Sequence, residues 1–289
     1  MDRYYSKVPE EILEQFKRFR SEHRSRYCEV GGIRWEYLTS GEASWQPLLL
    51  LPGGLSTAES AWRTITALEK GKYFLICPGY PPEVNTMSQL ADGIAEILNR
   101  EGVGTAYVLG GSYGGMVAQV IVHRHPGLVE KLVLSHTYPP EKSRARSVES
   151  SLRLIRRLPM FVLRRLLRTQ MAGILPSNPS PELLLINAQI HETVDTRMTR
   201  QAALSTYQRM IEYDQQEFTP ADLDNWHGKT LIILAEDDPT TSEYLRKELF
   251  DLYPGAKPHL FKGGSHATPI LESEEYIKVV ETFFSDLGE

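Results

Sequence analysis

Cysteines and long apolar runs are both scarce in this chain of 289 residues. Its two cysteines, Cys28 and Cys77, each lie in an apolar or strand-like stretch, which favours buried free thiols over a disulfide. No window reaches the roughly eighteen apolar residues of a membrane span. Residues 1–9 are charged and lack the apolar core that a secretory signal requires. We therefore expect a protein of the reducing cytoplasm, where thiols stay free.

An excess of charge of one sign is also missing. The net charge is -5 and charged residues make up 24% of the chain, so the composition does not favour nucleic acid as a partner. No group of His, Cys and carboxylate residues has the spacing of metal ligands, and we expect neither a metal nor an organic cofactor. The length suffices for one large domain, or one domain with an insertion, that buries about three-quarters of the surface of its unfolded chain.

Glycine, by contrast, is concentrated around one serine. The segment Gly110-Gly111-Ser112-Tyr113-Gly114-Gly115 follows a strand-like run and opens a helical pattern. A serine at such a turn is held in a strained conformation with its hydroxyl exposed, and the glycines let strand and helix approach closely. A phosphate loop would need a lysine after Gly115, and Ser112 stands where a dinucleotide-binding loop has its second glycine. Ser112 is therefore predicted to be a nucleophile.

Apolar segments alternate in a regular way around this turn. An amphipathic helix over 9–22 and a hairpin of 26–30 and 33–38 come first. Strands then alternate with helical patterns, the strands falling at 48–51, 73–77, 107–109, 129–134, 231–234 and 258–261. Strands that are apolar on both faces and separated by helices indicate a sheet buried on both sides. We predict an α/β fold with a doubly wound, mostly parallel sheet.

One long interruption breaks the alternation. Residues 139–224 hold helical patterns around 152–167, 183–191 and 202–213 but no comparable strand, with Pro159 breaking the first pattern. Long insertions at a loop cost little stability and often form lids over active sites. We therefore divide the chain into a core domain of residues 1–138 and 225–289 and an inserted helical cap of residues 139–224.

A serine nucleophile needs a base to take its proton and an acid to orient that base. The buried strand at 231–234 ends in the carboxylates Asp237 and Asp238, and its strand-end pattern favours Asp238 as the acid. His266 follows the next strand, and the loops at that edge of the sheet meet the serine turn in space. The order Ser, Asp, His, each at a strand end, favours His266 as the base.

The oxyanion of the reaction also needs donors, and two backbone amides are candidates. One is the amide of Tyr113, at the start of the helix after Ser112, and the other is the amide of Gly54, in the turn after the strand at 48–51. Leu55 is the alternative to Gly54 and is also a candidate pocket residue. His136, directly after a core strand, is a candidate pocket residue, although a structural role at the strand end is equally consistent with its position.

These motifs together resemble the α/β-hydrolase superfamily, from Ile33 to Phe284. The resemblance implies a serine hydrolase with a helical cap. Three short segments, 132–137, 158–165 and 253–256, are similar to the maspardin branch, for which a non-catalytic role is considered. That branch departs from a full triad in its histidine loop, whereas this chain keeps His266. A further departure is Pro52, where many relatives have a histidine before the oxyanion glycine.

The expected activity is hydrolysis of a small molecule with a carboxylic ester-type bond, in an ester, lactone or thioester, through a Ser112, His266 and Asp238 triad and an acyl-enzyme intermediate. A proline-iminopeptidase-like activity and hydrolysis of a carbon–carbon bond stay open, as does a non-catalytic binding protein.

The cap segment is unusually basic for an acidic chain. We expect its arginines either to be solvated or to attract anionic substrates or an anionic membrane surface. The residues concerned are Lys142, Arg144, Arg146, Arg153, Arg156, Arg157, Arg164, Arg165 and Arg168.

Overall fold

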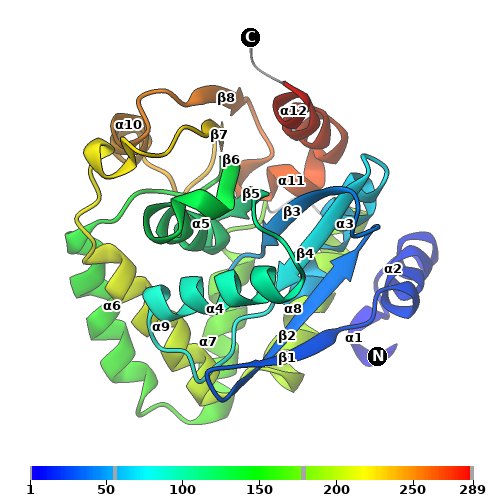
Figure 1. The fold of residues 1–289 in the computed structure, drawn as a ribbon. Coiled ribbons are helices and arrows are strands. Elements are labelled where there is room, and N and C mark those ends of the chain that lie inside the picture. The colour runs from blue at the N-terminus through cyan, green and yellow to red at the C-terminus, as the bar shows by residue number, and fades with distance from the viewer. Residues whose placement is uncertain (1, 55–56, 177–179, 287–289) are drawn as a thin grey trace.

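A computed structural model describes residues 2–54, 57–176 and 180–286 of the chain. Its centre is an eight-stranded sheet with the order β1-β2-β4-β3-β5-β6-β7-β8 (Figure 1). The antiparallel pairs are β1 with β2 and β2 with β4, and the remaining neighbours are parallel. The strands are β1 (Arg26–Val30), β2 (Ile33–Ser40), β3 (Gln46–Leu51), β4 (Tyr73–Pro78), β5 (Ala106–Gly111), β6 (Val129–Ser135), β7 (Lys229–Ala235) and β8 (Lys257–Phe261). The predicted mostly parallel α/β sheet is confirmed.

Helices cover both faces of the sheet because alternate side chains of each strand point to opposite sides. In β3, Leu48 and Leu50 pack with one group of helices, and Leu49 and Leu51 pack with the other. The first group includes α2 (Glu10–Glu22), α3 (Trp62–Glu69) and α12 (Ser273–Ser285), and the second includes α4 (Met87–Arg100), α5 (Tyr113–Arg124) and α10 (Glu243–Leu252). Burial on both faces explains the near-continuous apolar runs of the central strands.

Short helical turns connect these elements at several points. They are α1 (Asp2–Tyr5), η1 (Ala58–Ala61), η2 (Pro126–Leu128), η3 (Pro220–Leu223), η4 (Ser265–Ala267) and α11 (Thr268–Leu271). Both cysteines are free: Cys77 is buried in β4 and Cys28 is half-buried in β1.

In the described part of the chain, four α-helices lie between β6 and β7, and we call them the cap helices. They are α6 (Lys142–Ile155), α7 (Met160–Ala172), α8 (Pro181–Thr196) and α9 (Arg200–Asp214). Pro159 stands directly before α7 and separates it from α6, as its fixed backbone and missing N–H require. The inner faces of α6, α7 and α9 share a small apolar cluster of their own, which includes Leu152, Leu163 and Tyr207.

The two amino-terminal helices are attached to the cap as well as to the sheet. Glu192 on α8 accepts hydrogen bonds from the Tyr5 hydroxyl at 2.7 Å and from the Arg20 guanidinium at 2.6 Å. The same guanidinium donates to Glu59 at 2.8 Å. The start of the chain therefore ties α8 to the core.

A buried ion pair fixes the start of α6 to the end of α9. The Asp214 carboxylate is fully buried, and Arg144 Nε donates to its Oδ2 at 2.8 Å. Burial raises the pKa of Asp214, although Arg144 opposes this effect by stabilising the ionised form. Loss of Arg144 would leave a buried carboxylate without its charge partner.

We predict that Arg144→Ala lowers the free energy of unfolding by about 3–5 kcal/mol, because the Asp214 carboxylate then stays buried without its charge partner. Arg146→Ala is the matched control, since Arg146 is exposed and makes no ion pair within the described residues. It should change stability by less than about 0.5 kcal/mol. Urea unfolding followed by circular dichroism measures both, and equal effects of the two substitutions would show that the pair does not stabilise the fold.

Candidate active site

Ser112 occupies a sharp turn between β5 and α5. Its φ of 53° and ψ of -120° lie in a region that serine rarely adopts. The turn is fixed by two hydrogen bonds: the Ser112 amide donates to the Ser135 carbonyl at 2.9 Å, and Thr137 Oγ1 donates to the Ser112 carbonyl at 2.9 Å. Neighbouring strand β6 thus holds the backbone of the predicted nucleophile in its strained conformation.

Glycine is required at three positions around Ser112, because neighbouring atoms leave no space for a side chain. A Cβ atom on Gly110 would overlap the Gly114 carbonyl, and one on Gly114 would overlap the Leu51 carbonyl at the end of β3. A Cβ on Gly115 would collide with the Thr137 side chain. The glycine pattern of the sequence therefore reflects direct backbone-to-backbone packing.

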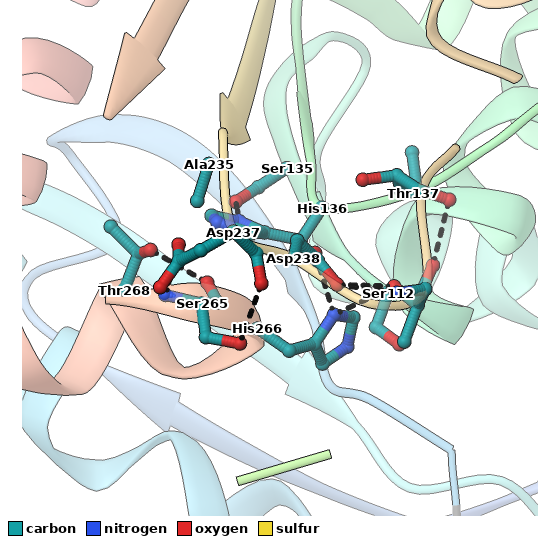
Figure 2. A network of polar contacts seen from close by, with 12 residues as sticks. Ser112, Ser135, His136, Thr137, Ala235, Asp237, Asp238, Ser265, His266 and Thr268 are labelled. Atoms are coloured by element: carbon teal, nitrogen blue, oxygen red, sulfur yellow. Dashed lines mark hydrogen bonds and ion pairs between the residues drawn. The ribbon is translucent and has the colours of Figure 1, made fainter. Parts of the chain in front are cut away.

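The structure brings His266 and Asp238 together at the edge of the sheet next to this turn. Asp238 follows β7 and His266 lies in η4 after β8. His266 Nδ1 is 2.9 Å from Asp238 Oδ2, and since a carboxylate only accepts, the ring nitrogen donates (Figure 2). Thr240 donates to the other oxygen of Asp238, from its amide at 2.8 Å and from its hydroxyl at 2.7 Å. The carboxylate is thereby held in one orientation.

Asp237, the competing candidate, has a different position. It is exposed, and its carboxylate accepts a hydrogen bond from the Ser265 amide at 3.0 Å. Asp237 thus holds the loop that carries His266, whereas Asp238 contacts the imidazole itself (Figure 2).

The pKa of Asp238 is lowered, and the balance of causes shows why the group stays ionised. Burial disfavours the charge and would raise the pKa, but the hydrogen bond and the charge of His266, together with the Thr240 bonds, outweigh burial. The side chain of Asp238 is fully buried and that of His266 is 9% exposed. A buried anion therefore lies against one nitrogen of the imidazole.

The two predicted oxyanion donors are neighbours in space. A Cβ on Gly54 would lie 3.2 Å from the Cβ of Tyr113, so the turn after β3 lies against the first residue of α5. Tyr113 is in the first turn of α5, where backbone N–H groups have no hydrogen-bond partner inside the helix. Leu55, the alternative donor, lies outside the described residues.

Tyr80 was not anticipated from the sequence and holds this turn in place. Its hydroxyl donates to the Pro52 carbonyl at 2.8 Å, and its ring lies 5.4 Å from the Tyr113 ring. Pro52 is buried and is held by Tyr80. It occupies the position at which many α/β hydrolases have a histidine. A lone tyrosine in a loop after β4 carries no pattern by which sequence reasoning could have found it.

Ser112 and His266 line one cavity of about 250 Å³, and Figure 2 shows the His266 ring directed toward Ser112. The cap helices α7 and α8 supply part of its wall, with Met171, Ile186 and Ile190 among the lining residues. No Lys, Arg, Asp or Glu belongs to the lining found in the described part of the chain. The cavity is therefore mostly apolar, with the reactive side chains at one end.

His136 also lines the cavity, as the sequence suggested, and its backbone φ of 49° is unusual for a residue with a side chain. It is 2% exposed, and its ring lies 5.9 Å from the His266 ring. Nδ1 lies 2.8 Å from Ser135 Oγ, whereas Nε2 has no hydrogen-bond partner among the described residues. Burial, together with the nearby His266, lowers the pKa of His136 to about 4.

Neither a metal centre nor a membrane-spanning helix accompanies this site within residues 2–54, 57–176 and 180–286. No three His, Cys, Asp or Glu side chains gather there as a metal ion would require. In the same ranges, every helix is too short or too polar to cross a bilayer.

We predict that His136 makes the protein less stable as the pH falls. The unfolded chain binds a proton near pH 6.5, but the folded chain resists protonation of His136 down to about pH 4, so stability declines across this interval. The size of the shift corresponds to about 3 kcal/mol. Urea unfolding across this pH range should show a shallower decline for His136→Gln than for the wild type. The surface variant His227→Gln should follow the wild type, and parallel curves for all three proteins would contradict the assignment.

Comparisons with known proteins agree with this fold. The Alpha/beta hydrolase family pattern matches residues 48–279. A Serratia proteamaculans (strain 568) protein named as the carbamate hydrolase RutD is 25% identical over 252 residues, covering 81% of this chain and 89% of that protein. The Bacillus subtilis carboxylesterase CesB superimposes with a TM-score of 0.74 at 17% identity, over 95% of this chain and 97% of its own. For the enol-lactonase of Burkholderia xenovorans LB400 the TM-score is 0.72 at 17% identity, over 90% and 100%. The two structural likenesses show the fold, and the family match shows that this chain belongs to the α/β hydrolase family.

Proposed function

We propose that this α/β hydrolase cleaves small, uncharged carboxylic esters with Ser112 as nucleophile, His266 as base and Asp238 as the group that orients the base. One observation carries the proposal: Ser112 and His266 line the same apolar cavity, while Asp238 binds Nδ1 of the His266 imidazole. The strain at Ser112 supports it, because an unusual backbone conformation at a cavity is typical of a reactive residue.

The proposed reaction has two half-reactions. Ser112 Oγ attacks the ester carbonyl carbon while His266 Nε2 takes the hydroxyl proton, and a tetrahedral intermediate forms. The bond to the alcohol oxygen then breaks, and His266 returns the proton to the leaving alcohol. Water repeats the sequence on the acyl-enzyme, with His266 again as base, and the carboxylic acid leaves with Ser112 restored.

Electrostatic arrangement favours both steps. The ionised Asp238 stabilises the imidazolium that forms when His266 takes the proton, and its hydrogen bond keeps Nε2 available for the serine. The amides of Gly54 and Tyr113 are proposed to stabilise the oxyanion. Each such donor typically lowers the activation barrier by about 2.7–4 kcal/mol. Tyr80 positions the turn that carries Gly54 through Pro52.

The cavity favours an uncharged acyl group over the other substrate classes considered. An amino-terminal peptide would bring an ammonium group, and a diketo acid would bring a carboxylate, yet the described lining holds no side chain of opposite charge for either. The cavity is at the small end for ligand sites, which favours short acyl chains. Two structural relatives are named as a carboxylesterase and an enol-lactonase, which is consistent with an ester or lactone carbonyl as the site of attack.

A panel of substrates tests the reaction class. Nitrophenyl acetate and butyrate should be hydrolysed faster than nitrophenyl palmitate, an amide and a diketo acid. A carbamate belongs in the panel because of the RutD relative. A protein that turns over none of these substrates would instead support the non-catalytic, maspardin-like alternative.

We predict that Ser112→Ala lowers kcat for nitrophenyl butyrate by about 10⁶-fold without unfolding the protein, since alanine fits the turn and lacks only the nucleophile. An organophosphonate should label the wild type once per chain, at Ser112, and should not label the variant. Ser60→Ala is the matched control, because Ser60 lines the same cavity and, among the described residues, its hydroxyl donates to the Thr57 carbonyl. Near-normal activity of Ser112→Ala would refute the mechanism.

We further predict that Asp238→Asn lowers kcat by about 10⁴-fold, because the amide no longer stabilises the imidazolium or enforces its orientation. Asp237→Asn should have a much smaller effect, since it retains an acceptor oxygen for the Ser265 amide. Steady-state kinetics of the two variants measure the ranking. The opposite ranking would assign the role of the acid to Asp237.

A further inference from the structure

The hairpin of α6 and α7 carries a charge opposite to that of the whole protein. Residues 142–176 contain nine basic residues and one acidic residue, Glu149, in a chain whose net charge is -5. This helical hairpin of the cap, at the outer edge of the molecule, therefore carries a local excess of positive charge (Figure 1).

Most of this charge is not neutralised within the molecule. Lys142, Arg144 and Arg168 pair with Glu217, Asp214 and Asp195. The other six basic residues make no ion pair with any residue in the described ranges. Arg164 is half-buried, and the other five are exposed: Arg146, Arg153, Arg156, Arg157 and Arg165.

The outer face of α6 presents arginines around an exposed leucine. Leu152 and Ile155 are buried toward the cap cluster, whereas Leu154 is 57% exposed. Residues 146, 150, 153, 154 and 157 follow helical spacing on the opposite side, and all of them are exposed. The packing of the cap therefore leaves an amphipathic stripe on α6 that no described part of the protein covers.

Helix α7 repeats the arrangement. Leu163 and Leu167 are buried, but Phe161 is 76% exposed and Leu166 is 44% exposed, with Arg165 one turn after Phe161. Three of the six large hydrophobic side chains exposed in the described chain thus belong to this hairpin.

The turn between α6 and α7 is held by hydrogen bonds from α9. The Arg200 guanidinium on α9 donates to the carbonyls of Ile155 at 2.7 Å and Leu158 at 2.6 Å. The tip of the hairpin therefore presents Leu154, Arg157 and Phe161 on a fixed backbone.

We propose that the α6–α7 hairpin is a docking surface for an anionic lipid bilayer, with Leu154, Phe161 and Leu166 entering the headgroup region and the unpaired arginines contacting acidic headgroups. A soluble anionic substrate does not account for the surface, because no arginine belongs to the described lining of the Ser112 cavity. A soluble polyanion would satisfy the arginines but leave the apolar side chains in water, whereas a bilayer surface accommodates both.

Vesicle binding tests this surface independently of any catalytic activity. The full-length protein is mixed with phosphatidylcholine vesicles that contain either no acidic lipid or about one-third phosphatidylserine, and bound protein is recovered by flotation. Binding is expected only to the acidic vesicles, and it should weaken as salt shortens the Debye length from about 8 Å.

Two variants separate the charged and apolar parts of the surface. The triple variant Arg153→Gln, Arg156→Gln and Arg157→Gln should bind acidic vesicles about 100-fold more weakly. Phe161→Ser should reduce binding about tenfold. Both variants are expected to keep the wild-type melting temperature, since these side chains are exposed.

A second triple variant controls for net charge. Arg18→Gln, Arg24→Gln and Lys278→Gln remove the same charge from exposed positions outside the cap, and this protein should bind as the wild type does. Absence of wild-type binding, or equal losses in the two triple variants, would overturn the proposal. The proposal would also be overturned if the protein bound heparin or DNA as tightly as acidic vesicles and Phe161→Ser did not weaken that binding. The surface would then recognise soluble polyanions.

Discussion

The close approach of α5 to the end of β3, which requires glycine at position 114, is the constraint on which the candidate site depends. A side chain at Gly114 would overlap the Leu51 carbonyl, and without that contact the turn carrying Ser112 could not lie against the turn carrying Gly54. The elbow is then fixed from the other side by Ser135 and Thr137. Strain at one serine is thus maintained by packing between three neighbouring strands and one helix.

Charged side chains are distributed unevenly between the cavity and the cap. The described lining of the Ser112 cavity contains no Lys, Arg, Asp or Glu, and the buried carboxylate of Asp238 beside it is held by Thr240 and His266. The cap instead carries the unpaired arginines on its outer surface. Because α7 contributes to both, with Met171 in the cavity wall and Arg165 outside, one helix links the apolar interior to the cationic exterior.

The sequence was informative wherever the chemistry follows from a strand end. The carboxyl edges of parallel strands converge, so the order of Ser112, Asp238 and His266 was enough to predict that the last two side chains meet. Tyr80 could not be predicted, because its contact with Pro52 depends on how two loops pack. The start of β3 at Gln46, two residues before the predicted strand, was obscured by Pro47, which lacks a donor but tolerates the beginning of a strand.

The hydrogen bonds from the amino-terminal helices to α8 connect these helices to the wall of the cavity. Tyr5 and Arg20 hold Glu192, while Ile186, Gln189, Ile190 and Thr193 on the same helix line the cavity. The α8 wall of the cavity is thus anchored to a segment that is distant from it in the sequence. For the engineering of this protein, a shortened or fused start of the chain is expected to affect the cavity wall as well as the sheet, because the amino-terminal helices contact both.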